Sequence, residues 1–589
     1  QLTGRQLTGR QLTGRQLTGR QLTGRQLPGA NRSGEVGGEG MDHFAPPAVT
    51  IDPITVEVIG SALSSIVEEM GEALIRASFS TNIKERRDCS TALFDLAGNT
   101  LCQAEHIPVH LGSFLDLIPQ IMKRHPAAEM RQGDVFVGND AYEGGGTHLP
   151  DIVLAEPVFV DGAMSAWAVN LAHHADFGDR GHAHIYQEGL RIPPIRLYRA
   201  GELQKDVQEL ILLNCQVPRE RLSDLRAQMA ANRLGVHRLQ SLCGKYGRET
   251  VMAAGAALQD YAERKMRAGI LAIPDGEYRF ADRYDCPEVE GELDMSCVIR
   301  VQGEEMHLGF DGSPQVRAGL NMTRTALLST VYYAIKTVVD PTILPNSGLA
   351  RPLHVTAPLG TIVNCVHPAA VNGRLGPCQR VVDLIYGALA QAVPERLMAA
   401  SNGACTSITF VGQQPRDGSL WVYLETIGGG FGARAERDGL DGVHVHMTNT
   451  SNLPAESLEV EYPLTLLRYE LVDGSGGPGR HRGGMGLRRV YRAEHECRVR
   501  VDGTRMLSSP WGLEGGLAGG RSAIVLGGGA RPLVGGNGTL RVGETIEVVT
   551  AGSGGYGPPS ERSAADVARD VREGAVSADV ALAVYGFSG

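Results

Sequence analysis

The chain has 589 residues, 76 of them glycine, with a formal net charge of −10 and no run of eighteen apolar residues that would predict a membrane-spanning helix. Without its first 40 residues, which hold six Arg and two Glu, the charge becomes −14, and so acidic a chain is not expected to bind a nucleic-acid backbone. Ten cysteines without CxxC spacing favour reduced thiols, and we expect a cytoplasmic protein that does not bind membranes.

Residues 1–40 are set apart by their composition. Five copies of Gln-Leu-Thr-Gly-Arg precede a glycine-rich stretch, and neither part has an apolar stripe to bury. We expect this segment to be a disordered low-complexity tail or a mis-assigned start, with Met41 as the natural first residue.

The rest of the chain is predicted to be α+β, with a large mixed α/β N-terminal region, 41–270, packed on a β-rich C-terminal region, 271–589. Apolar residues at helical spacing predict the first helix over 53–77. The other elements expected in the N-terminal region are, in chain order, two short strands within 91–105, a helix at about 113–124, a strand at 135–140, a β-hairpin over 151–172 and helices over 219–268. The hairpin carries Asp161-Gly162, a dipeptide typical of two-residue turns.

The C-terminal region is predicted to be mainly β. Strands are expected around 277–310, followed by two apolar core helices near 323–338 and 378–393. From about 405 to 553 the pattern indicates short strands separated by glycine turns, which account for part of the high glycine content. An amphipathic segment over 562–585 closes the chain.

Side chains that can bind metal gather at the open end of the predicted hairpin. With Asp161-Gly162 as the turn, Asp151 is predicted to lie opposite Ala172, and Pro150 opposite His173. Imidazoles with a carboxylate are a typical set of metal ligands. The group brought together in this way comprises His148, Asp151, His173 and His174. The alternative interpretation is a polar hairpin rim whose histidines cap backbone groups.

Strand alternation does not decide which histidines belong to the site. Strict alternation places His148 and His173 on one face, and Asp151 with His174 on the other. Pro150 and the glycines before it are expected to break that alternation, so either His173 or His174 remains a candidate ligand.

No nucleotide-binding motif is found. Gly244-Lys245 is followed by Tyr246, so it is not a Walker A sequence. The run from Gly428 to Ala433 has glycines at dinucleotide-binding spacing, but Asp438-Gly439 breaks the chain where a helix would have to begin.

Seven segments of the chain form a recognisable series. They are GGTHLPD (145–151), AHHAD (172–176), IYQEGLRIPP (185–194), NGRLGP (372–377), the stretch 428–459, SPWGLEGG (509–516) and GSGGYGPPSER (552–562). In this order they resemble the hydantoinase B/oxoprolinase family, and the similarity extends from about residue 50 to the end.

The resemblance implies a two-protein enzyme, and therefore a hetero-oligomer. An actin-like, hydantoinase A-like partner binds ATP and phosphorylates an amide or carbonyl oxygen, while this subunit completes the reaction at a divalent metal ion, Zn or Mn. Matched residue by residue, the ligands implied are Asp88, His148, Asp151 and His173. Asp88 rests on the resemblance alone, and the alternative is a solvated charge beside Arg86 and Arg87.

The chain departs from the family pattern after the paired histidines. Asp176-Phe177-Gly178-Asp179 stands where the family often has a second glycine after Asp-Ile/Val-Gly. The QEGLRIPP form is more similar to the N-methylhydantoinase and ketone-carboxylase branches than to the oxoprolinase branch.

Further candidates concern substrate binding. His444 and His446 alternate with valines before Asn449, and these three are predicted either to position substrate or to form a polar strand face with a turn-capping asparagine. Arg374 is predicted to hold a substrate carboxylate or phosphate through two hydrogen bonds, or to be a surface arginine.

Three hypotheses for the function follow. The first is the metal-dependent subunit of an ATP-dependent hydrolase of cyclic amides such as hydantoins, lactams or oxoproline, in which the metal activates water and His174 or Asp176 accepts or relays its proton. The second is a subunit of an ATP-dependent carboxylase of ketones such as acetone or acetophenone. The third is a non-catalytic scaffold for the ATP-binding partner.

Overall fold

The computed structural model describes residues 51–104, 106–174, 180–529, 533 and 535–588, and Ala48–Gly589 form one compact unit. The expectation for residues 1–40 lies outside the described residues, as does the candidate Asp176. Within the described part of the chain, no helix combines the length and apolar character needed to cross a membrane.

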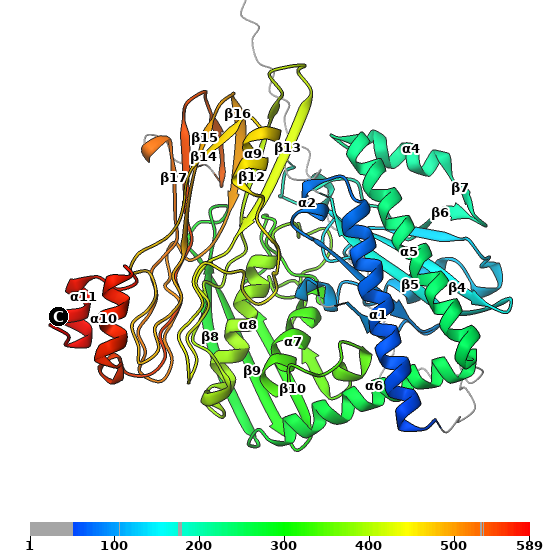
Figure 1. Ribbon diagram of the computed structural model, residues 1–589, viewed down its shortest axis with the longest axis horizontal. Helices are drawn as coiled ribbons and strands as arrows, with labels where there is room; N and C mark the ends of the chain where they lie inside the picture. The colour runs from blue at the N-terminus through cyan, green and yellow to red at the C-terminus, as the bar shows by residue number, and fades with distance from the viewer. Residues whose placement is uncertain (1–50, 105, 175–179, 530–532, 534, 589) are drawn as a thin grey trace, which may run out of the picture. The chain divides into compact units, whose positions relative to one another are not determined.

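A seven-stranded antiparallel sheet organises the first part of the described chain (Figure 1). Its strand order is β2-β1-β5-β4-β3-β6-β7. The strands are β1 (Cys89–Phe94), β2 (Thr100–Gln103), β3 (Val135–Gly138), β4 (Asp151–Val160), β5 (Ala163–His173), β6 (Ile195–Arg199) and β7 (Glu202–Leu203). The predicted hairpin forms the centre of this sheet as β4 and β5, so it is held on both sides.

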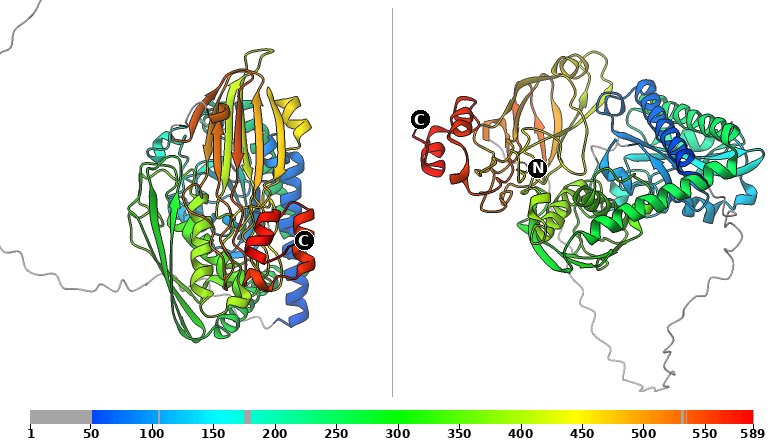
Figure 2. Two further views of the ribbon diagram at one scale, coloured as in Figure 1. Left: turned by 90° about the vertical axis from the view of Figure 1, so that its left-hand side faces the viewer. Right: turned by 60° about the horizontal axis from the view of Figure 1, so that its bottom comes forward.

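Three long helices pack on one another and contact strands of this sheet (Figure 2). They are α1 (Pro53–Ala77), α5 (Pro218–Tyr246) and α6 (Arg248–Leu271). The first begins after Asp52, whose carboxylate accepts a hydrogen bond from the backbone N–H of Thr55, and its apolar stripe is buried from Ile59 to Leu74. The shorter helices of this part are α2 (Thr81–Lys84), α3 (Leu117–Arg124) and α4 (Lys205–Leu213).

A four-stranded sheet and two buried helices form the middle of the chain. The sheet has the order β11-β10-β9-β8, and α8 packs on β8, β9 and α7. The elements are β8 (Gly276–Asp285), β9 (Glu292–Gln302), β10 (Glu305–Gly312), α7 (Arg324–Val339), β11 (Leu353–Thr356) and α8 (Leu375–Leu389). Every residue of α8 from Gly376 to Leu389 is buried, including the polar Gln379, Arg380 and Asp383 within an otherwise apolar sequence.

Two four-stranded sheets face each other across a common apolar core in the last part. Their orders are β13-β12-β16-β18 and β14-β15-β19-β17, and Phe410, Tyr491 and Val548 are among the residues they bury together. The strands are β12 (Thr406–Gln413), β13 (Leu420–Ile427), β14 (Leu464–Leu471), β15 (Leu487–Ala493), β16 (Cys497–Asp502), β17 (Ala523–Leu526), β18 (Asn537–Leu540) and β19 (Thr545–Val549). Helices α9 (Ala455–Glu461), α10 (Ala564–Arg572) and α11 (Ala578–Tyr585) complete this part.

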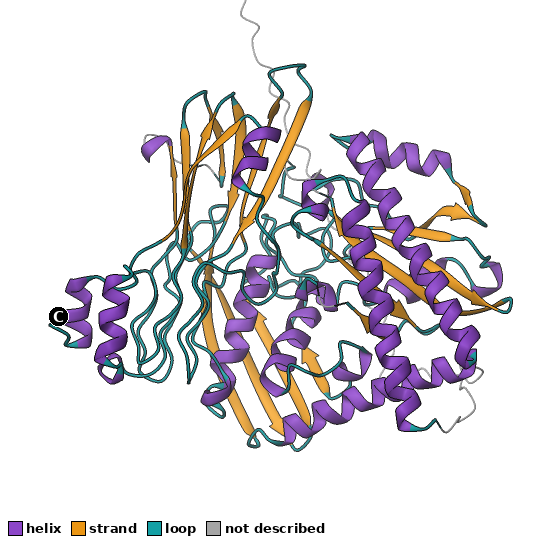
Figure 3. Cartoon of the chain, viewed as in Figure 1, coloured by secondary structure: helices purple, strands orange, loops and turns teal. Residues whose placement is uncertain are grey.

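Long loops leave one end of these sheets and run beside one another (Figure 3). A Cβ atom on Gly483 would lie 2.1 Å from the carbonyl oxygen of Ser553, and one on Gly555 would lie 2.2 Å from that of Pro478. Backbone therefore packs directly on backbone here. The glycine excess of the C-terminal region reflects this close packing of loops as well as the predicted turns.

The predicted α+β class is confirmed, and the helix over 53–77 has the predicted bounds. One element differs from expectation: the amphipathic segment over 562–585 forms two helices, α10 and α11, rather than one piece. Gly574, at φ 76°, lies between them in the left-handed region, where a helix ends.

Candidate metal centre

The register of the β4–β5 hairpin differs by one residue from the predicted register at its open end. Near the turn, Val160 pairs with Ala163 as predicted, but the register shifts between Val158 and Phe159. Ser165 is the extra residue in β5, so Asp151 pairs with His173 instead of with Ala172. The prediction was wrong because a β-bulge leaves no clear mark in the alternation of this apolar hairpin. Since a slip of one residue exchanges the two faces of a strand, the bulge places Asp151 and His173 on the same face.

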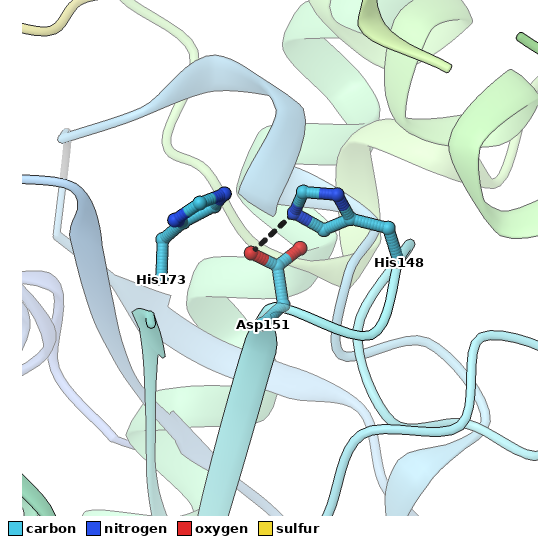
Figure 4. Close-up of side chains that lie close together, drawn as sticks. All are labelled: His148, Asp151 and His173. Carbon is cyan, nitrogen blue, oxygen red and sulfur yellow. Dashed lines mark hydrogen bonds and ion pairs between the residues drawn. The ribbon is translucent and has the colours of Figure 1, made fainter. Parts of the chain in front are cut away.

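Three side chains form the candidate metal centre, which we call the metal cluster: His148, Asp151 and His173 (Figure 4). The Nε2 atom of His148 lies 3.0 Å from Oδ1 of Asp151, and the ring centroids of His148 and His173 are 4.9 Å apart. One potential ligand atom from each residue lies within 4.8 Å of the other two. His148 and Asp151 are buried, whereas His173 is partly exposed.

The loop before β4 holds this end of the hairpin. Gly146 has φ +84°, and a Cβ atom there would lie 2.8 Å from Cβ of Asp151. The side-chain amide of Asn139 donates to the carbonyl of Leu149 at 2.8 Å, and His174 N–H donates to the carbonyl of Pro150 at 2.8 Å. The glycine-rich loop therefore lets the backbone pass directly beside the Asp151 side chain.

His173 is oriented from outside the hairpin. Asn82 lies with its amide nitrogen 2.7 Å from Nδ1 of His173, and the same nitrogen donates to the His173 carbonyl at 3.0 Å. The His173 N–H donates to the carbonyl of Asp88 at 3.0 Å. Because the Asn82 amide nitrogen only donates, Nδ1 of His173 accepts, and in the neutral ring the proton is on Nε2.

Arg374 is buried against the cluster. Its Nε donates to Oγ1 of Thr147 at 2.9 Å, its Nη2 donates to Oδ2 of Asp151 at 3.1 Å, and its Nη1 lies 3.0 Å from Nδ1 of His148. The predicted surface arginine is therefore excluded. The same contacts engage three of the five N–H groups of the guanidinium and make it the counter-charge of Asp151, while Arg374 also lines the neighbouring pocket.

Burial and nearby charges favour neutral rings at His148 and His173 and an ionised carboxylate at Asp151. Burial lowers the pKa of His148, and the positive charge of Arg374 lowers it further. Burial and the neighbouring His148 lower the pKa of His173 well below its ordinary value. Burial alone would raise the pKa of Asp151, but His148 and Arg374 outweigh it and hold that pKa well below its usual range. Neutral imidazoles beside an ionised carboxylate are the forms that bind a divalent cation, so the residues present fit such an ion.

Asp88 and His174 lie next to the cluster but outside the group of three. Asp88 is buried, not solvated, and burial raises the pKa of its carboxyl to about 6, with Arg86 acting in the opposite direction. The Nε2 atom of His174 lies 3.1 Å from Oε1 of Gln228, and His174 is not among the three residues of the cluster.

The three remaining candidates lie elsewhere. His444 contacts the hydroxyls of Thr448 and Thr450, each at 3.3 Å. His446 is buried, with Nε2 3.2 Å from Oδ1 of Asp383. Asn449 is exposed and donates to the carbonyl of His106 at 3.0 Å. None of the three belongs to the residues that line the pocket beside the cluster.

That pocket has a volume of about 80 Å³, whereas one water needs only ~10–15 Å³ on a comparable measure. It adjoins His148, His173 and His174 on the cluster side. Its other walls include Tyr284, Asn372, Arg374, Cys405, Ser407, Thr409, Thr426, Asp502 and Thr504. The walls thus combine distant segments, and the pocket is open to a small molecule rather than to a macromolecule.

Sequence reasoning missed Asn82 and Asp502. Asn82 orients His173 across 91 residues of sequence, and Asp502 accepts hydrogen bonds from Arg500 at 2.9 Å and from Ser407 at 3.4 Å in the pocket wall. Both residues come from segments without a motif, so no spacing rule identifies them.

Known proteins resemble the chain over most of its length. The family model described as hydantoinase B/oxoprolinase matches residues 52–559. The chain is 35% identical to a protein of Pseudomonas sp. (strain NS671) named as the B-type subunit of a putative D-/L-hydantoinase, over 91% of this chain and 95% of that protein. It is 33% identical to the beta subunit of the caprolactamase of Pseudomonas jessenii, over 91% and 96% of the two chains.

Two solved structures share the fold. The crystal structure of ATP-dependent caprolactamase from Pseudomonas jessenii matches with a TM-score of 0.81 at 31% identity, covering 91% of this chain and 96% of that chain. A nucleotide-free acetone carboxylase matches with a TM-score of 0.80 at 19% identity, covering 91% and 79%. The second likeness concerns the fold alone.

Proposed function

The chain belongs to the hydantoinase B/oxoprolinase family, and we propose that it is the metal-dependent subunit of an ATP-dependent hydrolase of cyclic amides. The observation that carries the proposal is the convergence of His148, Asp151 and His173 beside a small-molecule pocket. Their protonation states suit a divalent cation, and relatives named as components of a hydantoinase and of a caprolactamase support the substrate class.

His148, Asp151 and His173 would hold the ion, with Asp88 as the candidate fourth ligand. A bound Zn²⁺ or Mn²⁺ supplies Lewis-acid chemistry, which polarises a carbonyl oxygen and activates water. The positive charge of Arg374 balances the negative charge of Asp151, and its guanidinium also contacts Nδ1 of His148. His148 and His173 stay neutral at neutral pH, so that their ring nitrogens remain available as ligands.

His174 or Asp176 is proposed to accept or relay the proton of the attacking water. His174 lines the pocket and is held by Gln228, which places an imidazole beside the cluster but not within it. Asp176 follows two residues later in the chain, outside the described residues.

ATP is proposed to bind to a hydantoinase A-like partner subunit, since this chain has no nucleotide-binding motif. Two relatives are named as one subunit of a larger enzyme, which supports an assembly of this kind. In the overall reaction, a cyclic amide, ATP and two water molecules give ADP, phosphate and the ring-opened acid, which is an amino acid from a lactam and an N-carbamoyl amino acid from a hydantoin. The partner's phosphoryl transfer makes the amide carbon electrophilic, and the present chain contributes the hydrolytic site.

The test uses the complex of this chain with its ATP-binding partner. Hydantoin, 2-pyrrolidone, caprolactam and 5-oxoproline are each supplied with and without ATP, and ring-opened product and ADP are measured. We expect ATP-dependent ring opening of at least one of these compounds and stoichiometric metal by elemental analysis. His148→Ala should abolish both, whereas His307→Ala, at an exposed histidine stacked on His354, should change neither.

Two results would contradict the proposal. Full ATP-dependent activity in metal-free His148→Ala protein would exclude the metal-dependent mechanism. Bicarbonate-dependent consumption of acetone or acetophenone, without ring opening of any cyclic amide, would instead identify a ketone carboxylase.

A further inference from the structure

Glu188 is a buried carboxylate to which no role has so far been assigned, although it lies within the family-like segment IYQEGLRIPP. Its side chain is 1% exposed and turns away from solvent toward the segment that precedes α8. Oε1 accepts from the backbone N–H of Val371 at 2.9 Å and from that of Asn372 at 2.8 Å, while Oε2 lies 3.0 Å from the same Val371 nitrogen. One carboxylate thus holds two consecutive peptide units.

The next peptide, between Asn372 and Gly373, is held by a different segment of the chain. The N–H of Gly373 donates to the carbonyl of Gly319 at 2.7 Å, and the N–H of Arg374 donates back to the carbonyl of Val371 at 3.1 Å. With the N–H groups of residues 371, 372 and 373 all engaged, the planes of these peptides have little freedom to rotate.

This fixed segment contacts the metal cluster twice. The carbonyl oxygen of Asn372 lies 3.0 Å from Nδ1 of His148, and Arg374 reaches both His148 and Asp151. The Asn372 carbonyl only accepts hydrogen bonds and Nη1 of Arg374 only donates them, and both lie 3.0 Å from Nδ1 of His148. Together they hold this edge of the ring, so that Nε2 on the other edge faces Asp151.

We propose that Glu188 is a positioning residue of the metal centre: by holding the N–H groups of Val371 and Asn372 it fixes the segment whose Asn372 carbonyl and Arg374 side chain contact His148, and thereby sets the ring orientation that binds the ion. The inference rests on the metal centre proposed above. It gives a role to the buried carboxylate of Glu188, which is 40 residues away from His148 in sequence. His182, whose Nδ1 lies 3.2 Å from Oε1 of Glu188, packs behind the carboxylate.

The experiment measures metal binding directly, on the full chain freed of metal by a chelator. Zn²⁺ affinity is determined by competition with a chromophoric chelator, and the visible absorption of bound Co²⁺ reports the ligand geometry. Wild type is compared with Glu188→Ala and Glu188→Gln. The control is Asp134→Ala, because Asp134 is likewise buried and accepts from two backbone N–H groups, those of Arg131 and Ala200, but contacts no residue of the cluster.

We expect Glu188→Ala to bind Zn²⁺ ~10–100-fold more weakly than wild type, the range typical of partners that orient a ligand. Glu188→Gln should lose only a few-fold, because its amide oxygen still accepts from Val371 and Asn372, and it should partly restore the Co²⁺ spectrum that Glu188→Ala alters. Asp134→Ala should leave affinity and spectrum unchanged, whatever it does to stability.

Several outcomes would overturn the inference. One is wild-type affinity and an unchanged Co²⁺ spectrum in both Glu188 variants, and another is an equal loss in Asp134→Ala, which would indicate general destabilisation. If Glu188→Ala does not fold, the Glu188→Gln affinity and spectrum decide in the same way. If the wild-type protein binds no divalent ion, the proposed function itself is refuted. If wild type binds the metal and the Glu188 variants bind it equally well with an unchanged spectrum, only the role of Glu188 is refuted.

Discussion

The metal cluster and a second buried group, which we call the Asp383 network, are built from the same kinds of side chain and are assembled differently. The Asp383 network comprises Asp282, Arg380, Asp383, His446 and Arg505. Asp383 accepts from Nη2 of Arg505 at 3.0 Å and lies 3.2 Å from Nε2 of His446. Two arginines face two aspartates here, so the charges balance within the protein.

The metal cluster differs in where its free atoms point. Two imidazoles with lowered pKa values direct ring nitrogens toward one carboxylate, and two of these three residues line the pocket. No residue of the Asp383 network lines that pocket, although Arg380 contacts its wall through the hydroxyl of Thr504 at 3.2 Å. Residue type therefore does not distinguish a candidate site from a structural network. What distinguishes the candidate site is that two neutral imidazoles and one carboxylate converge beside an accessible cavity.

The largest difference between the metal cluster and the Asp383 network is expected for a matched pair of substitutions, Asp151→Asn and Asp383→Asn. Both remove a carboxylate charge from a buried position. We expect Asp151→Asn to eliminate detectable metal and ATP-dependent turnover of the complex, because the anionic ligand is lost, while Asp383→Asn retains metal per folded chain. Elemental analysis of both purified proteins checks this. Equal metal content in the two variants would erase the distinction between the groups.

The next effect concerns stability. Arg505→Ala leaves Asp383 buried with His446 and the Ser401 N–H as partners but without an arginine, and it should lower the free energy of unfolding by about 3–5 kcal/mol, as breaking a buried ion pair does. Urea denaturation of the metal-free chain measures the loss. Zn²⁺ affinity of the folded variant should stay at the wild-type value, and a large loss of affinity would mean that the network also shapes the metal cluster.

A smaller effect is expected at the glycine beside the cluster. Gly146 and Gly162 have φ +84° and +79°, so alanine is strained at both, by roughly 1–2 kcal/mol. Only at Gly146 does the new Cβ meet Asp151, at 2.8 Å; at Gly162 nothing lies within 4 Å. Gly146→Ala should therefore weaken Zn²⁺ binding at least ~10-fold, and Gly162→Ala should not. Similar Zn²⁺ affinities in the two variants would show that the position of Asp151 tolerates the shift.

The smallest expected effect is a pH dependence at His444, which belongs to neither group. Burial lowers the pKa of His444 to about 4, so the folded chain prefers the neutral ring. This contribution to stability is complete above the unfolded-state pKa of about 6.5 and is lost as the pH falls through about 4.

Between pH 7 and pH 5 the His444 linkage should lower the stability of wild type by roughly 1–2 kcal/mol relative to His444→Gln, a residue that carries no titrating ring. Urea midpoints of the two proteins at both pH values measure the difference. Parallel pH profiles would indicate that His444 is solvated in the folded state.

Much of the local structure was predictable because its causes are local. The stripe from Ile59 to Leu74 and the Asp52 cap produce α1, and Asp161-Gly162 produces the turn of the hairpin. The hairpin in turn brings His148, Asp151 and the paired histidines into one neighbourhood, since strand pairing follows from the turn. The seven family-like segments likewise sufficed to predict membership of the hydantoinase B/oxoprolinase family, which is confirmed.

What the sequence determined by itself was thus the class of fold, the family and the neighbourhood of the site. Only the tertiary structure decided which residues meet there. The bulge at Ser165 pairs Asp151 with His173, and Arg374 reaches Thr147 across 227 residues. The bulge is local but leaves no mark in the alternation of the apolar hairpin, and the Arg374 contact depends on packing between distant segments, which no local period or spacing encodes. The same reason separates His446, which belongs to a charge-balanced network, from the imidazoles of the metal cluster.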